Sequence, residues 1–173
     1  AGRKAKAELG AKGVVNRVVS LIRKVLASAE LTDEDIGGVG LGIPGPVDPS
    51  TGHVFLCANL GESWADLDLA DVLQERLGIR PYIENDVNVA AVGEHTYGAA
   101  RGYRDAIVIF VGTGIGGGLI LDGKLRTGTR FGAGEVGHTT LLADGPLCSC
   151  GQRGHAEALA SRRAIERYIL EAI

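Results

Sequence analysis

The chain has 173 residues, of which 45% are apolar and 23% are charged, and its formal net charge is −3 at pH 7. This composition is typical of globular domains, and the lack of a basic surplus argues against a protein that binds nucleic acid by neutralising phosphates. No apolar run approaches the roughly 20 residues that span a bilayer. Residues 1–8 do not have the pattern of a secretion signal, so we expect a soluble, cytoplasmic protein with no membrane partner.

The first hundred residues alternate between helix and strand patterns. Apolar residues at helical spacing predict amphipathic helices, and short apolar runs bounded by turn residues predict buried strands. The expected elements are a helix over 13–29, strands over 38–43 and 53–57, a helix over 68–77, a strand over 82–84 and a helix over 87–97. This alternation indicates an α/β architecture with a mainly parallel sheet.

The rest of the chain is rich in glycine. We expect a buried strand over 106–111, the glycine loop GTGIGGG over 112–118, a strand over 119–121, a hairpin turn at 122–123, a Cys/His loop over 144–155, and one helix from about 157 to the end. Residues 98–104 are typical of a connector. The predicted division is therefore an N-terminal α/β lobe over 1–104 and a C-terminal lobe over 105–173.

The glycine loop is the first candidate site. Successive backbone N–H groups in such a loop can cradle phosphate oxygens, and Thr113 adds a hydroxyl. The loop is neither a P-loop, which needs Gly-Lys-Ser/Thr, nor a dinucleotide fingerprint, because a strand rather than a helix follows it. A glycine-rich hairpin without a ligand is the alternative interpretation.

Four potential metal ligands lie within a short stretch of the chain: His138, Cys148, Cys150 and His155. A Cys₂His₂ set is typical of a structural, tetrahedral Zn²⁺ site. A disulfide between Cys148 and Cys150 would close a small, strained ring. Exposed cysteines beside two unrelated histidines are the alternative.

The other cysteine and the other histidines give no such pattern. Cys57 lies in an apolar strand, and we interpret it as an inert core residue. We interpret His53 and His95 as ordinary surface or turn residues, since neither has ligand-like neighbours in the sequence.

Acidic residues at the ends of predicted elements are the third candidate site. Asp86 follows Asn85 at the start of a helix, where the helix dipole favours the ionised carboxylate that a general base needs. The simpler interpretation is a helix N-cap. Glu135 and Glu157 flank the predicted metal loop and could accept hydrogen bonds from a polyhydroxylated ligand, or they could be solvated surface residues.

Taken together, these segments resemble the ROK family of bacterial sugar kinases and sugar-responsive repressors. The resemblance rests on five motifs, in the family's order and spacing: GIPGPVD (42–48), ENDVNVAA (84–91), GTGIGGG (112–118), GEVGH (134–138) and CSCGQRG (148–154). It implies an α/β, actin-like ATPase (RNase H-like) fold, with two lobes and with sugar and ATP bound in the cleft. It also implies a homodimer.

The resemblance assigns roles to particular residues. Asp86 would be the general base that deprotonates the sugar hydroxyl attacking ATP. The sugar-binding residues would be Gly45, Asn85, Asp86, Glu135, His138 and Glu157. The phosphates of ATP, accompanied by Mg²⁺, would be bound by Thr113, Gly114, Gly116 and Gly117, while His138 would serve both the zinc and the sugar.

Three differences from the family pattern affect these expectations. His155 stands where the family usually has a third cysteine, so the zinc affinity would be altered. The family's first phosphate motif is not in this chain, and the chain stops before the expected adenosine pocket. Since the chain also lacks methionine, we expect it to be part of a longer protein, truncated at both ends.

Three hypotheses follow for the function. The first is a hexokinase-type enzyme that converts glucose to glucose 6-phosphate, with an N-acetylmannosamine or N-acetylglucosamine kinase as the runner-up. The second is a ROK-type sugar-responsive transcriptional repressor, which would carry an N-terminal helix-turn-helix. The third is a sugar-binding module without catalysis. Asp86 favours a kinase, because a pure sensor needs no base.

Overall fold

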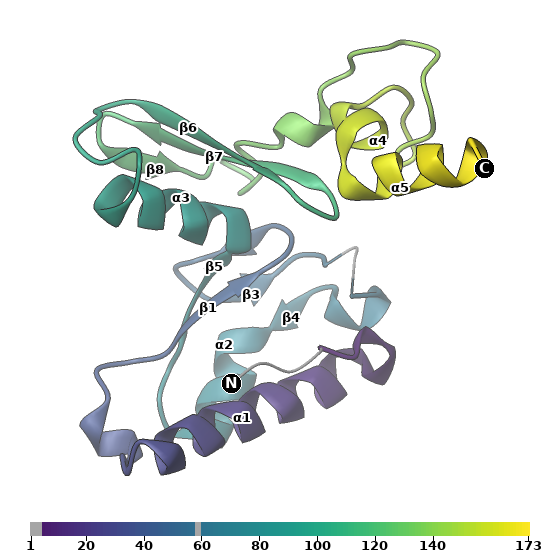
Figure 1. Ribbon diagram of the computed structural model, residues 1–173. Helices are drawn as coiled ribbons and strands as arrows, with labels where there is room; N and C mark the ends of the chain where they lie inside the picture. Colours follow the sequence, from purple (N-terminus) through teal and green to yellow (C-terminus); the bar gives the residue numbers. More distant parts are fainter. Residues whose placement is uncertain (1–4, 58–59) are drawn as a thin grey trace. The chain divides into compact units, whose positions relative to one another are not determined.

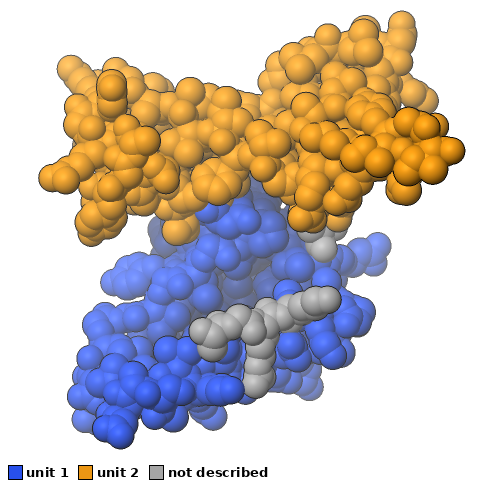
Figure 2. Space-filling view, in the orientation of Figure 1, with its two compact units in different colours: residues 1–86 blue, residues 87–173 orange. Residues whose placement is uncertain are grey.

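The computed structural model describes residues 5–57 and 60–173 and has a mixed α/β architecture (Figure 1). The chain divides into two compact units, residues 1–86 and residues 87–173 (Figure 2). The predicted lobes, 1–104 and 105–173, put the helix over 87–97 in the first lobe. In the structure, this helix packs with the strands that follow it, and the assignment of whole lobes stays a prediction.

Unit 1 contains the helices that the apolar spacing predicted. They are α1 (Gly10–Ser28) and α2 (Leu69–Leu77), with three short 3₁₀ turns, η1 (Ala7–Leu9), η2 (Asp33–Asp35) and η3 (Glu62–Trp64). The two helices contact each other, since the guanidinium of Arg23 donates to the carbonyl of Arg76 at 2.8 Å. α2 ends where predicted, at Gly78, whose φ of 74° suits a residue without a side chain.

The strands of unit 1 form two small sheets. β1 (Gly40–Ile43) pairs in parallel with β5 (Tyr82–Asn85), whereas β2 (Val47–Asp48), β3 (His53–Val54) and β4 (Leu67–Asp68) form an antiparallel sheet. The mainly parallel sheet was therefore a wrong prediction. Residues 49–52 form a short turn between β2 and β3. A connection this short can join only antiparallel strands, so β2 and β3 form a hairpin.

The apolar residues of both helices and both sheets form one core in unit 1. Its fully buried side chains include Val47, Val54, Cys57, Leu69, Leu73 and Ile83. Burying a leucine side chain stabilises a fold by about 2 kcal/mol, so α2 is held mainly by its apolar face. This core supports the residues that follow β1 and β5.

Cys57 is a core residue, as predicted. Its thiol donates to the carbonyl oxygen of Pro44 at 2.7 Å. Burial raises the pKa of this thiol to about 11, and the negative charge of Asp86 adds to the rise. The thiol is therefore protonated and unreactive near neutral pH.

The raised pKa of Cys57 predicts a loss of stability in alkaline solution. Above about pH 9 the unfolded thiol ionises while the folded thiol stays protonated, so the free energy of unfolding falls until the folded thiol also ionises near pH 11. Urea unfolding at about pH 8 and about pH 10 measures this loss. The loss should be smaller in Cys57→Ala; equal losses in both proteins would contradict it.

The helix α3 (Asp86–Tyr97) follows β5 directly, belongs to unit 2 from Val87 onward and lies against an antiparallel sheet. This sheet consists of β6 (Ala106–Val111), β7 (Ile115–Leu121) and β8 (Lys124–Arg126). The predicted glycine loop over 112–118 is shorter than expected, because Gly116, Gly117 and Gly118 belong to β7. A Cβ atom on Gly118 would overlap the side chain of Ala91, so this glycine lets α3 approach the sheet.

The C-terminal part of unit 2 consists of η4 (Val136–His138), α4 (Ala156–Ala160) and α5 (Arg162–Glu171). The single helix predicted from about residue 157 was wrong, since Ser161 interrupts it. Ser161 has an extended backbone, and its hydroxyl accepts a hydrogen bond from the Ala164 amide at 3.3 Å, which caps α5. None of the helices in the described part of the chain combines the length and the apolar content needed to cross a bilayer.

Candidate metal centre and sugar-binding residues

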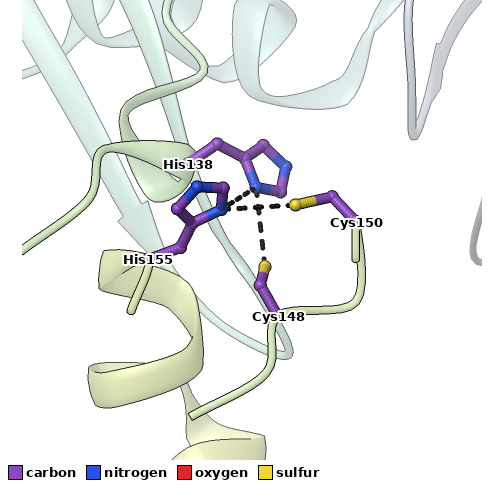
Figure 3. A group of neighbouring side chains, drawn as sticks. All are labelled: His138, Cys148, Cys150 and His155. Atoms are coloured by element: carbon purple, nitrogen blue, oxygen red, sulfur yellow. Dashed lines mark hydrogen bonds between the residues drawn. The ribbon is translucent and has the colours of Figure 1, made fainter. Parts of the chain in front are cut away.

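The four predicted metal ligands point toward a common centre (Figure 3). The Nδ1 atoms of His138 and His155 are 3.3 Å apart, and Cys148 Sγ lies 3.6 Å from His138 Nδ1. Cys150 Sγ lies 3.3 Å from His155 Nδ1. With Zn–N near 2.05 Å and Zn–S near 2.3 Å, a tetrahedron has N–N edges of about 3.3 Å and N–S edges of about 3.6 Å. The four side chains therefore fit one tetrahedral ion.

The loop that carries the cysteines is closed by its own backbone. The amide of Cys148 donates to the carbonyl of Gln152 at 2.7 Å, and the amide of Gly151 donates to the carbonyl of Cys148 at 3.0 Å. Gly154 has a φ of 68°, and a Cβ atom there would overlap the carbonyl of Leu142. Glycine at this position therefore lets two segments meet and brings His155 to the cysteines.

His138 connects the metal cluster with Glu135. Its Nδ1 atom belongs to the cluster, whereas its Nε2 atom lies 3.7 Å from a carboxylate oxygen of Glu135. A carboxylate beside the second nitrogen of a metal-binding histidine orients the ring. Both side chains are partly exposed, so this edge of the cluster is open to a ligand.

Glu157 joins the metal loop to the glycine turn. One of its carboxylate oxygens accepts a hydrogen bond from Ser149 Oγ at 3.1 Å, and the other accepts from the Ile115 amide at 2.9 Å. A Cβ atom on Gly114 would overlap this carboxylate. Glu157 is thus held in place from both sides and is not a loosely solvated surface residue.

The structure divides the four predicted phosphate-binding residues into two pairs. Thr113 and Gly114 lie in the turn between β6 and β7, whereas Gly116 and Gly117 lie in β7. A Cβ atom on Gly116 would overlap Val87, and one on Gly117 would lie 2.7 Å from the carbonyl of Gly134. Close packing thus accounts for the glycines in the strand, and phosphate binding by any of the four residues stays a prediction.

In unit 1 the predicted residues lie at the carboxyl ends of β1 and β5. The side-chain amide of Asn85 donates to the carbonyl of Gly45 at 3.2 Å, which ties the Pro44–Gly45 turn to β5. The amide of Asn85 donates to Glu84 Oε1 at 2.7 Å. Asp86 follows as the exposed first residue of α3. Unit 1 therefore presents Gly45, Asn85 and Asp86 together.

Gly45→Ala is expected to disturb this arrangement. Gly45 has a φ of 103°, and a Cβ atom there would overlap the carbonyl of Leu56. A disfavoured backbone and a clash with backbone atoms should lower the free energy of unfolding by about 2–4 kcal/mol. Urea unfolding measures the change. Gly40→Ala is the control, because nothing lies within 4 Å of its added Cβ atom; equal effects would contradict the prediction.

Sequence reasoning missed the contacts of Ser149, Arg162 and His53. Ser149 lies inside the CSC motif, but only the fold shows its contact with Glu157. The guanidinium of Arg162 contacts Thr113, which is distant in the sequence.

The sequence shows no ligand-like neighbours for His53. In the structure, β3 pairs with β4, and this pairing places His53 Nδ1 2.7 Å from a carboxylate oxygen of Asp68. His95 is half-buried and bonds to the carbonyl of Tyr103 at 2.9 Å.

Known proteins resemble the chain in both sequence and structure. A glucokinase of Thermotoga maritima is 37% identical over 164 residues, which are 95% of this chain and 50% of the glucokinase. A xylose repressor of Caldicellulosiruptor bescii is 39% identical over 145 residues, which are 84% of this chain and 36% of the repressor. The crystal structure of a ROK family glucokinase from Streptomyces griseus in complex with glucose and AMPPNP has a TM-score of 0.81 and 38% identity, over 94% of this chain and 50% of that protein.

These similarities identify both the fold and the family of the chain. The chain has part of an actin-like ATPase fold, as the solved glucokinase structure shows. It belongs to the ROK family, which matches residues 4–172. The chain spans about half the length of the glucokinases that it matches.

Proposed function

We propose that this chain is part of an ATP-dependent sugar kinase whose substrate is glucose. The observation that carries the proposal is the exposed Asp86 directly after Asn85, whose side chain is bonded to the Gly45 carbonyl. A sensor needs groups that bind sugar, but a kinase also needs a base at a fixed place. The glucokinases among the relatives support this assignment.

In the proposed reaction, Asp86 accepts the proton of the sugar hydroxyl that attacks the terminal phosphate of ATP, and the bond from this phosphorus to the oxygen of the β-phosphate breaks, so that ADP leaves. On the family resemblance, we assign Asn85 and the Gly45 turn to orienting the sugar, and Glu135, His138 and Glu157 to binding its hydroxyls. Thr113 and Gly114 donate hydrogen bonds to the phosphates. Because phosphoryl transfer depends mainly on positioning and charge neutralisation, Mg²⁺ bound to ATP would supply further positive charge.

We propose that His138, Cys148, Cys150 and His155 bind a structural Zn²⁺. Their donor atoms lie within 4.8 Å of one another and suit a tetrahedral ion. Four protein ligands leave no open position for a substrate, so the ion would stiffen the loop that holds His138 and Glu157. The use of ATP and of reduced cysteine ligands favours a cytoplasmic enzyme. We propose a homodimer on the family resemblance.

The test is calorimetric titration of the zinc-loaded chain with glucose, N-acetylglucosamine, N-acetylmannosamine and xylose, followed by phosphorylation assays of the full-length gene product. We expect selective binding of glucose and formation of glucose 6-phosphate. Phosphorylation of an N-acetylated hexosamine instead would keep the kinase and change its substrate. Sugar binding without phosphate transfer would overturn the kinase proposal.

A sugar-responsive repressor is the second candidate, because the xylose repressor is as similar to this chain as the glucokinases are. A repressor requires a DNA-binding segment elsewhere in its full-length chain. Sugar-dependent binding of the full-length protein to its own promoter DNA, without sugar phosphorylation, would establish this alternative. Phosphorylation without DNA binding would exclude it.

A further inference from the structure

Arg162, the first residue of α5, contacts the turn that is predicted to bind phosphate. Its amide donates to the carbonyl of Gly112 at 2.9 Å, and its Nη2 atom lies 3.2 Å from Thr113 Oγ1. In Figure 1, the end of the β6–β7 hairpin lies beside α4 and α5, and these two bonds connect the hairpin with α5. The guanidinium is therefore located beside the hydroxyl that was assigned to phosphate.

The guanidinium retains donors for a further partner. Its Nε atom lies 3.4 Å from Glu166 and its Nη2 atom contacts Thr113, but within residues 5–57 and 60–173 no partner is found for Nη1. The side chain is 66% exposed. Arginine presents several donors in one plane, which suits phosphate oxygens.

The turn also has backbone donors beside Arg162. The Gly112 amide donates to Gly114, and the Ile115 amide donates to Glu157. The backbone amides of Thr113 and Gly114 donate no hydrogen bond to any acceptor within the described part of the chain. Two adjacent N–H groups, a hydroxyl and a guanidinium thus share one small surface, which is a favourable arrangement for an anion.

Negatively charged side chains lie close to this guanidinium and to the turn. The carboxylate of Glu157 contacts the same turn and would repel a phosphate group, and Glu166 adds a second negative charge close to Arg162. The positive charge of Arg162, which contacts the turn, offsets this repulsion. The guanidinium of Arg162 therefore has two effects at the turn: it bonds to Thr113, and its positive charge counteracts the nearby carboxylates.

We propose that Arg162 is a phosphate-binding residue that contacts the phosphates of ATP at the turn over 112–114. The proposal rests on the proposed kinase function and extends it to a residue outside the motifs. A purely structural role, in which Arg162 only fastens α5 to the turn, makes different predictions. A hydrogen bond to Thr113 can be retained by a neutral side chain, whereas phosphate binding requires the positive charge.

The experiment compares Arg162→Gln, Arg162→Lys and the control Arg163→Gln in the full-length gene product. Arg163 is the next residue in α5, so its substitution removes the same charge from the same helix. The measurements are kcat, the KM values for ATP and for sugar, the Kd values for ADP and adenosine by calorimetry, and the Tm.

We expect Arg162→Gln to raise the KM for ATP and the Kd for ADP about tenfold, since hydrogen bonds from charged donors are strong. The KM for sugar and the Kd for adenosine should stay unchanged, because neither involves a phosphate. Arg162→Lys keeps the charge but not the planar donors, so it should recover part of the loss, and Arg163→Gln should have an effect below about twofold.

Other outcomes distinguish failure of this inference from failure of the proposed function. If the unmodified protein phosphorylates sugar but Arg162→Gln leaves the KM for ATP unchanged, Arg162 does not bind phosphate. An equal loss of ADP and adenosine binding would show a structural role instead. If the unmodified protein neither binds nor uses ATP, the proposed function fails and the inference fails with it.

Discussion

Asp86→Asn is expected to reduce the turnover of the proposed full-length kinase about 100-fold or more, because a positioned general base contributes about 10²–10⁴-fold to a rate. Asparagine has the shape of aspartate but cannot accept the proton of the sugar hydroxyl. Asp86 is the exposed first residue of α3, directly after β5, so the substitution leaves the core of unit 1 intact. The KM for sugar should change much less than kcat.

The measurement is steady-state phosphorylation of glucose, accompanied by calorimetry of glucose binding. Asp33→Asn is a matched control, because Asp33 is an exposed aspartate in the 3₁₀ turn η2. Its turnover should equal that of the unmodified protein. If Asp86→Asn retained full turnover, Asp86 would not be the base, and the helix N-cap would be the better account of this residue.

Local features of the fold could be predicted because their causes lie within a few neighbouring residues. The end of α2 at Gly78 follows from the left-handed backbone that glycine adopts there. The start of α3 at Asp86 follows from the preference of Asn and Asp for helix starts. The four metal ligands are close in sequence, so a loop can bring them together.

Several of the failed or missing predictions concern contacts between distant segments. Gly116 and Gly118 looked like loop residues, but their lack of side chains serves the contact of β7 with α3. The hydrogen bonds of Glu157 with Ile115 and of Arg162 with Thr113 join residues more than forty positions apart in the sequence. No local pattern records such contacts, so the environment of the glycine turn could be described only from the structure.

Removing Cys148, a ligand of the proposed zinc ion, is expected to have the largest effect on stability. A bound ion would stabilise only the folded loop, and apparent zinc-binding energies in small zinc sites are about 10 kcal/mol or more. Cys148→Ser should therefore abolish binding of one zinc per chain and lower the Tm of unit 2. Metal analysis after dialysis and thermal unfolding measure both effects. Cys57→Ala is the control, since Cys57 lies in the core of unit 1 and should not change the zinc content.

Zinc loss should also weaken sugar binding, because His138 Nδ1 belongs to the metal cluster while Nε2 lies beside Glu135. Chelation should raise the Kd for glucose by about tenfold or more, the range seen when groups that orient metal ligands are lost. His155→Cys, which restores the usual ligand set of the family, should retain both zinc and sugar affinity. Unchanged sugar affinity after chelation would disprove the shared role of His138. If the chain is isolated without zinc and binds no zinc when zinc is titrated in, the metal site is disproved. If both affinities fall together, the metal loop is part of the sugar site.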